Sequence, residues 1–340
     1  MSINENQSAK KPDIGGQAVL DGVMMKAPDH IAVAVRKPDG DIVIKRDAYV
    51  SPAKKHKWMG LPMIRGAVNM VMMMRLGMEV LSSSGQMSGM LDEEPSRFEK
   101  WLAKKLGKGV DKVVMGVAMV LALALSAGLF VLLPNLPAKA MRGAGWSLLS
   151  VNLISGLIRI VLLVGYLIFC GMIPEMKKTF QYHGAEHKTV YAHEAEVELT
   201  PENAQKFSCL HPRCGTSFLL ITFVFSILFF SVMDELALSL LGLDLGKVYF
   251  IRIISRLLLL PLVAGISYEI LKGLAHAQSP FARALRWPGM QLQRLTTREP
   301  SLEMLEVAIA SMNAALDGLP QGERTGEGYA LIKKAKPALQ

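Results

Sequence analysis

The chain has 340 residues, of which 51% are hydrophobic and 20% are charged, and its 38 basic and 29 acidic side chains give a formal net charge of +9. This mixture excludes a disordered or fibrous protein and is unlike an ordinary soluble enzyme. The three cysteines cannot form a complete disulfide framework, which favours a reducing environment.

The amino-terminal part predicts a small β element after a disordered start. Residues 1–14 are polar, and we expect neither structure nor a cleavable secretion signal there. Residues 31–36 and 41–48 alternate apolar and polar side chains around a Lys-Pro-Asp-Gly turn, which indicates a β-hairpin. Residues 15–19 predict another short strand that is entered through glycines. We therefore expect residues 15–56 to form a small cytoplasmic sheet.

Residues 57–112 predict amphipathic helices. In the methionine-rich segment 61–81, Arg65, Asn69 and Glu79 fall on one narrow polar stripe at 100° per residue. Such a helix either lies on the membrane surface, or packs on the membrane helices, or lines a cavity with its polar stripe. The sequence leaves these alternatives open.

Four apolar segments predict a helical membrane domain over residues 113–273. The first, 113–133, has no charged residue and is long enough to cross a hydrocarbon core of about 30 Å. The others cover 148–173, 215–233 and 250–271. Charges inside them either reach an interface or mark a functional path; they are Arg159, Arg252, Arg256 and Glu269.

The distribution of Lys and Arg predicts the orientation of these spans. Basic residues accumulate in segments 97–112 and 174–214, and few occur in 134–147 and 234–249. Because basic loops resist translocation, we expect the first two segments and both termini to be cytoplasmic. The net charge is then a signal of topology, and we expect a lipid bilayer rather than nucleic acid as the partner.

The loop 174–214 contains the pattern His-x-x-Glu-His. On a helix over residues 175–196, His183 and His187 lie one turn apart on one face, a spacing that suits a shared divalent metal, most simply zinc. Glu186 lies on the same side, where it would act as general base or as a further ligand. The two histidines are also compatible with ordinary packing or with contact to lipid headgroups.

Two alternative sets of further ligands predict different chemistry. Glu269 near the cytoplasmic end of the fourth span would leave a coordination position open for water, as a hydrolytic centre requires. His211 and Cys214 before the third span would instead close the site as a structural zinc. After the spans, residues 274–316 predict a cytoplasmic segment ending in a helix, and 317–340 predict a disordered tail.

Six motifs occur along residues 15–316. They are 15–26 (GGQAVLDGVMMK), 60–66 (GLPMIRG), 182–188 (YHGAEHK), 211–218 (HPRCGTSF), 267–269 (SYE) and 296–300 (TTREP). Together they resemble the YqhQ-like family, a group of bacterial multi-pass membrane proteins classed as a domain of unknown function, DUF1385. The resemblance implies a metal-dependent enzyme of the bacterial inner membrane. Asp21 stands where the family has Glu, and Lys26 stands where it has Arg.

Three classes of function follow from these features. The first is a metal-dependent hydrolase acting on a lipid-linked or peptide substrate, which the separate carboxylate of Glu186 favours. The second is a lipid or ion translocator that uses the charged spans. The third is a membrane scaffold in which zinc fixes the loop.

Overall fold

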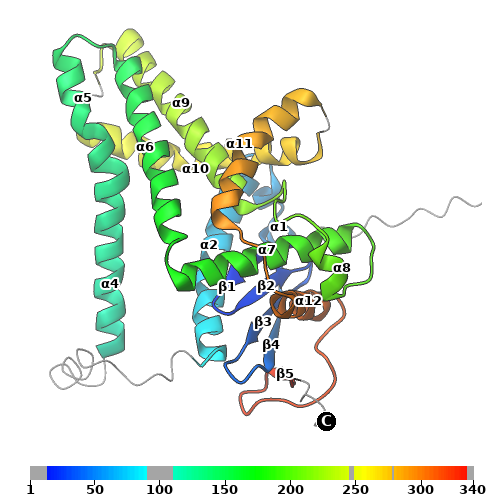
Figure 1. Ribbon diagram of the computed structural model, residues 1–340. Helices are drawn as coiled ribbons and strands as arrows, with labels where there is room; N and C mark the ends of the chain where they lie inside the picture. The colour runs from blue at the N-terminus through cyan, green and yellow to red at the C-terminus, as the bar shows by residue number, and fades with distance from the viewer. Residues whose placement is uncertain (1–13, 90–109, 245–248, 278, 335–340) are drawn as a thin grey trace, which may run out of the picture.

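The computed structural model describes residues 14–89, 110–244, 249–277 and 279–334. The fold is mainly helical, and a small antiparallel sheet lies at one end of a group of long helices (Figure 1). This architecture confirms the predicted fold class. Residues 1–13 and 90–109, for which the sequence predicts disorder and part of the amphipathic region, lie outside the described residues.

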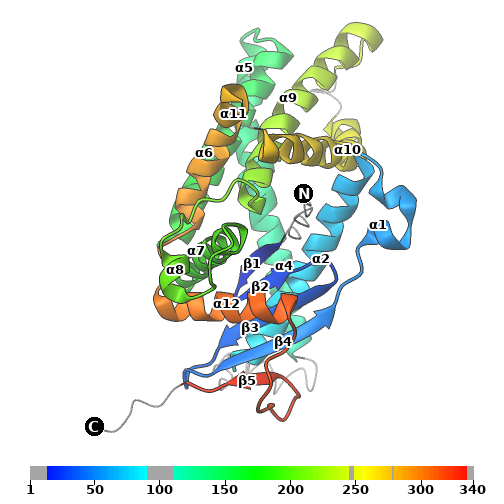
Figure 2. The ribbon, with the colours of Figure 1, turned by 90° about the vertical axis from the view of Figure 1, so that its right-hand side faces the viewer.

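The sheet has five strands in the order β1-β2-β3-β4-β5, and all neighbours are antiparallel. Because successive side chains alternate between the two faces, the central strands bury residues on both. One face packs on α7 (Pro174–Glu194) and α12 (Leu302–Leu316), and the other packs on α2 (Ile64–Met87) (Figure 2). The strands are β1 (Gly15–Val19), β2 (Gly22–Lys26), β3 (His30–Arg36), β4 (Ile42–Ala48) and β5 (Ala330–Ile332).

The sequence predicted some of these strands from their turn residues and missed others. The predicted hairpin is β3–β4, and Gly40 in its turn has a φ of 93°. A tight turn before β2 places Asp21 at a φ of 52°, where its carboxylate pairs with Lys178 of α7. The sequence did not predict β2, and the expected tail after residue 316 instead contributes β5.

The helix α2 (Ile64–Met87) joins the sheet to the long helices. A Cβ at Gly66 would lie 2.8 Å from the Cα of Gly265 in α10 (Tyr249–His276), so the two backbones are in close contact. Beside them, the Arg65 guanidinium donates to both carboxylate oxygens of Glu269, with distances of 2.7 and 2.5 Å. Of the alternatives for this helix, the structure shows packing on the membrane helices. The short α1 (Pro52–Lys55) and a 3-10 turn, η1 (Lys57–Gly60), precede it.

Among the described residues, four helices are long and apolar enough to cross a membrane. The first combines α4 (Val110–Ala127), a π-helical turn, η3 (Gly128–Leu132), and α5 (Leu133–Gly143). The others are α6 (Leu148–Cys170), α9 (Gly215–Leu241) and α10 (Tyr249–His276).

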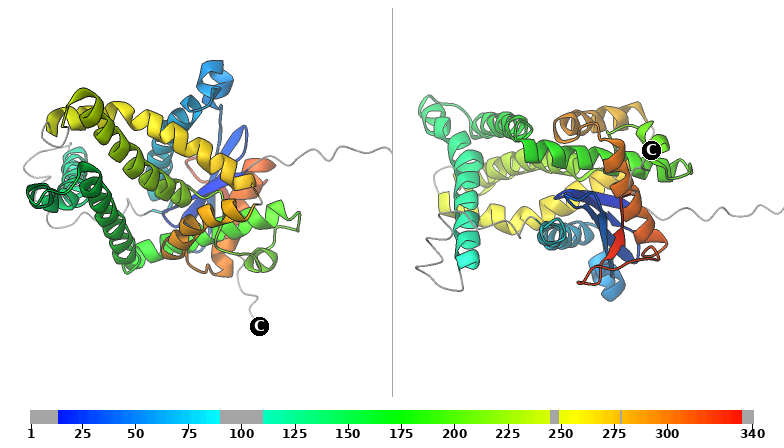
Figure 3. Two further views of the ribbon diagram at one scale, coloured as in Figure 1. Left: turned by 90° about the horizontal axis from the view of Figure 1, so that it is seen from above. Right: turned by 60° about the horizontal axis from the view of Figure 1, so that its bottom comes forward.

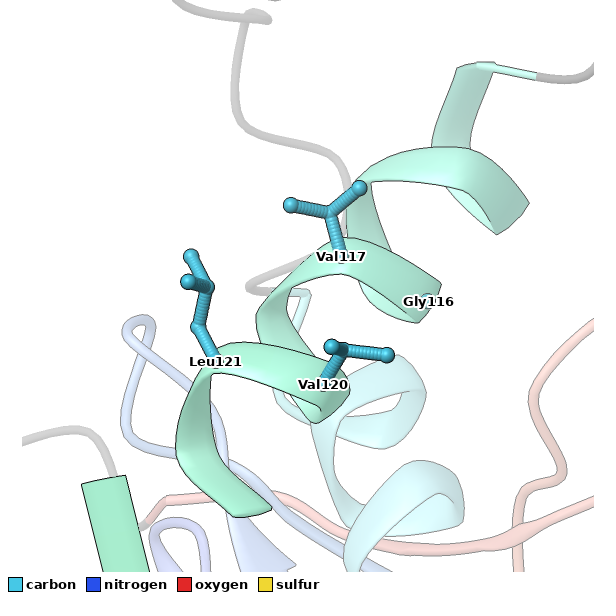
Figure 4. Close-up of a pocket in the computed structure, with 4 residues that line it drawn as sticks. All are labelled: Gly116, Val117, Val120 and Leu121. Carbon is cyan, nitrogen blue, oxygen red and sulfur yellow. The ribbon is translucent and has the colours of Figure 1, made fainter. Parts of the chain in front are cut away.

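The helix α4 stands apart from the other helices (Figures 1 and 3). Its side chains Val117, Val120 and Leu121 point outward and are more than half exposed (Figure 4). Apolar side chains exposed in this number are typical of contact with lipid.

The remaining helices are α7 (Pro174–Glu194), α8 (Pro201–Gln205), α11 (Pro280–Thr296) and α12 (Leu302–Leu316). The helix α12 packs on the sheet, whereas α11 runs back along α9. Because β5 pairs with β4, the region after the last candidate span lies next to the region before the first one.

Candidate metal centre

The middle of α7 is covered on all sides, which explains why a helix with many polar residues is stable here. Every residue from 184 to 190 is buried, and Tyr182 is also buried against the sheet. Burial raises the pKa of the Tyr182 hydroxyl well above its usual range, and the Asp21 carboxylate adds to this effect. As the spacing predicted, His183 and His187 are neighbours on one face, with ring centroids 4.5 Å apart.

Backbone carbonyls fix the orientation of both imidazoles. Nδ1 of His183 lies 2.8 Å from the carbonyl oxygen of Thr296, and Nδ1 of His187 lies 2.5 Å from that of Cys209. A carbonyl oxygen only accepts hydrogen bonds, so each Nδ1 carries a proton. A neutral ring then presents the lone pair of Nε2, which is how carbonyls orient metal-binding histidines.

Cys214 completes a group of three ligand atoms. Its Sγ lies 3.3 Å from Nε2 of His183, and the ligand atoms of His183, His187 and Cys214 all lie within 4.8 Å of one another. Zn–N bonds of about 2.0–2.1 Å and Zn–S bonds of about 2.3 Å separate tetrahedral ligand atoms by about 3.3–3.6 Å. The group therefore fits such an ion after a small inward movement.

Two local features fit the requirements of a metal centre. Nε2 of His187 is buried and has no hydrogen-bond partner among the described residues, an arrangement that normally costs free energy. Cys214 is the N-cap of α9, and its Sγ accepts a hydrogen bond from the backbone N–H of Thr216. The sulfur therefore faces the exposed N–H groups at the start of the helix.

Glu186 lies beside the three ligand atoms. Its side chain is buried, and its Oε2 lies 3.4 Å from Nε2 of His187. A Cβ on Gly16 would lie 2.6 Å from Cγ of Glu186, so the strand β1 makes room for the carboxylate by having a glycine there. Next to it, the side chain of Gln17 approaches Gly77 of α2.

The structure places the other predicted ligands elsewhere. Both oxygens of Glu269 bind Arg65, so this carboxylate is not part of the group. Nδ1 of His211 accepts a hydrogen bond from Arg213, and its Nε2 lies 3.5 Å from the Glu194 carboxylate. Neither predicted set of ligands is assembled as a whole, because Cys214 joins the two histidines without His211 or Glu269.

Residues 296–300, which we call the strap, pack against α7. The sequence alone did not connect this segment with the site. A Cβ on Gly184 would lie 2.1 Å from the carbonyl oxygen of Arg298, so only glycine permits this contact. Glu299 of the strap binds the buried Lys188 at 2.8 Å. The strap was visible in the sequence only as the TTREP motif.

Cys209 differs from Cys214 although it is also close to the histidines. Burial raises the pKa of the Cys209 thiol to about 12, and its hydrogen bond to Glu299 contributes. The thiol therefore stays protonated near neutral pH and donates to the strap. Its sulfur is a hydrogen-bond donor there, whereas its backbone carbonyl orients His187.

Comparison with known proteins is consistent with these motifs. Residues 61–318 match the family described as "Protein of unknown function (DUF1385)". The chain belongs to this family. It is also 34% identical over 311 residues to "Uncharacterized protein YqhQ" of Bacillus subtilis (strain 168), and the match covers 90% of this chain and 92% of that protein. No solved structure matches. The histidines, Glu186 and Cys214 all lie in the region that defines the family.

The ion pair between Arg65 and Glu269 predicts an energetic coupling. Both side chains are about a quarter exposed, and removal of one partner leaves the other charge at the membrane edge without its counter-ion. We expect Arg65→Gln and Glu269→Gln each to lower the melting temperature in detergent, and the double variant to lose less than the sum. The coupling should fall in the range of about 0.5–3 kcal/mol found for contacting pairs. Strictly additive losses would contradict the ion pair.

Proposed function

We propose that the protein is a metal-dependent hydrolase with its centre at one face of the membrane. The proposal rests on the convergence of His183, His187 and Cys214 beside the buried carboxylate of Glu186. Three protein ligands leave the fourth tetrahedral position open, which is typical of catalytic rather than structural zinc. Imidazole and thiolate ligands both suit zinc.

The chain provides the groups that hydrolysis requires. A divalent ion at this site supplies Lewis-acid polarisation of a carbonyl or phosphoryl oxygen and makes water more acidic. Glu186 accepts the proton of the attacking water and transfers it to the leaving group, as a general base and then a general acid. Its packing against Gly16 holds the carboxylate beside Nε2 of His187.

The location of the centre favours a substrate carried by the membrane. Cys214 is the N-cap of the span α9, so the ligands lie where the membrane helix begins. A lipid-linked molecule or a peptide at the membrane surface would reach this level. We place this face in the cytoplasm of a bacterial inner membrane because segment 174–214 is rich in basic residues; an external location of a reporter fused after residue 196 would reject that orientation.

A structural zinc is the second candidate function. The ligands and the carbonyls that orient them come from three parts of the chain, namely α7, residues 209–214 and the end of α11, and the centre is largely buried. An ion would therefore tie together parts of the chain that are far apart in sequence. In that case Glu186 would be needed for stability but not for turnover.

Metal content tests the ligand set. We expect close to one zinc per chain in the purified protein, and at least a tenfold loss in His183→Ala and Cys214→Ser, because each removes a ligand. Cys209→Ser is the matched control for the second variant and should retain zinc, as should Glu269→Gln. The measurement is elemental analysis by plasma mass spectrometry. Unchanged zinc in Cys214→Ser, or its loss in Glu269→Gln, would contradict the assignment.

Substitution of Glu186 separates the hydrolase from the scaffold. We expect Glu186→Gln to retain zinc and to lower turnover by about 10²–10⁴-fold, because the amide cannot accept the proton of water. Suitable probes are p-nitrophenyl acetate and bis(p-nitrophenyl) phosphate, with the full chain in lipid nanodiscs. Equal turnover by the wild type and Glu186→Gln would exclude this base. If the zinc-loaded wild type turns over neither probe and zinc removal only lowers its melting temperature, the scaffold is favoured.

A further inference from the structure

A second polar cluster lies within the membrane helices, away from the metal centre. A cavity of about 310 Å³ is bounded by α5, η3, α6, α9 and α10. Arg159, Arg252 and Arg256 line it together with aromatic and aliphatic side chains. Asp234, which binds two of these arginines, is 20 residues beyond Cys214 along α9, or about 30 Å at the rise of an α-helix.

The charges at this cavity do not balance. Oδ2 of Asp234 accepts hydrogen bonds from Arg252 at 2.8 Å, from Arg256 at 3.0 Å and from Asn152 at 2.9 Å. Arg252 and Arg256 therefore share this one carboxylate, and among the described residues no carboxylate lines the cavity itself. Two guanidinium groups against one carboxylate leave a formal excess of one positive charge.

One of these arginines lies too deep in its helix to reach the membrane surface. Arg159 is the middle residue of the 23-residue helix α6, about 16 Å from either end, which is farther than its side chain extends. Its Nε donates to the carbonyl oxygen of Phe130 at 3.1 Å. Nε of Arg256 is buried and has no hydrogen-bond partner among the described residues. The positive charge that Arg252 and Arg256 retain after sharing one carboxylate is costly among membrane helices, so an anion at the cavity would stabilise it.

The walls of the cavity indicate which kind of anion fits. Guanidinium groups bind phosphate oxygens with two parallel hydrogen bonds. The rings of Phe130, Phe223 and Phe230 line the same cavity and provide an apolar surface for hydrocarbon chains. We propose that this cavity binds the phosphate group of an anionic lipid. The site is separate from the metal centre and does not depend on the proposed hydrolase.

Titration with defined lipids tests this site. The full-length wild type in a neutral detergent should bind phosphatidic acid, measured by native mass spectrometry, and should bind phosphatidylcholine at least tenfold more weakly. Arg159→Gln and Arg256→Gln should weaken phosphatidic acid binding at least tenfold. Arg142→Gln is the matched control, because Arg142 pairs with Asp244 and does not line the cavity; its affinity should equal that of the wild type.

Further measurements keep the proposal falsifiable. Circular dichroism melting confirms that each variant is folded, and Arg159→Lys, which keeps the charge but loses the two-pronged hydrogen bonding, should bind with intermediate affinity if Arg159→Gln does not fold. Equal affinity for phosphatidic acid in all folded variants would overturn the proposal, because the lipid would then bind elsewhere on the surface. Displacement of phosphatidic acid by millimolar inorganic phosphate would also overturn it and identify a free anion as the ligand.

Discussion

The orientation of two imidazole rings by backbone carbonyls is the constraint on which the candidate centre depends. The acceptors, Thr296 and Cys209, are 113 and 22 residues from the histidines that they orient. Both Nδ1–H groups are therefore satisfied only when α7, the loop after α8 and the end of α11 are assembled together. This assembly directs Nε2 of His183 and His187 toward Cys214. It also explains why the polar helix α7 is enclosed by the sheet, α8, α12 and the strap.

Glycine and charge keep these distant segments in place. The backbone of the strap approaches α7 at Gly184, and that of β1 approaches Glu186 at Gly16, at distances that a side chain would prevent. On the membrane side, the ion pair between Arg65 and Glu269 and the contact at Gly66 hold α2 against α10. The sheet and the helices packed on it are thus attached to the spans at two places, through α2 on α10 and through Cys214 at the start of α9. A rigid attachment of this kind suits a centre that acts on molecules at the membrane.

The sequence predicted features that depend on local pattern and failed where the outcome depends on distant partners. The spans and the β3–β4 hairpin follow from hydropathy and turn residues, and helical spacing was enough to place His183 and His187 together. The third ligand could not be chosen, because Glu269 is bound by a residue 204 positions away in the chain. Helix α11 was not predicted as a separate element, and it contains Pro288, which disfavours a helix interior; packing on α9 maintains it. Strand β5 is short and pairs across the chain, so no local signal indicated it.

The measurement that tests the central claim most directly is X-ray absorption at the zinc edge of the zinc-loaded protein in detergent. A His, His, Cys centre with an open position predicts one sulfur at about 2.3 Å, two imidazole nitrogens at about 2.0–2.1 Å and one further oxygen or nitrogen atom. The sulfur signal should remain in Cys209→Ser, and any zinc that Cys214→Ser still holds should have no sulfur ligand. A spectrum without sulfur, or one with two sulfur ligands, would contradict the account.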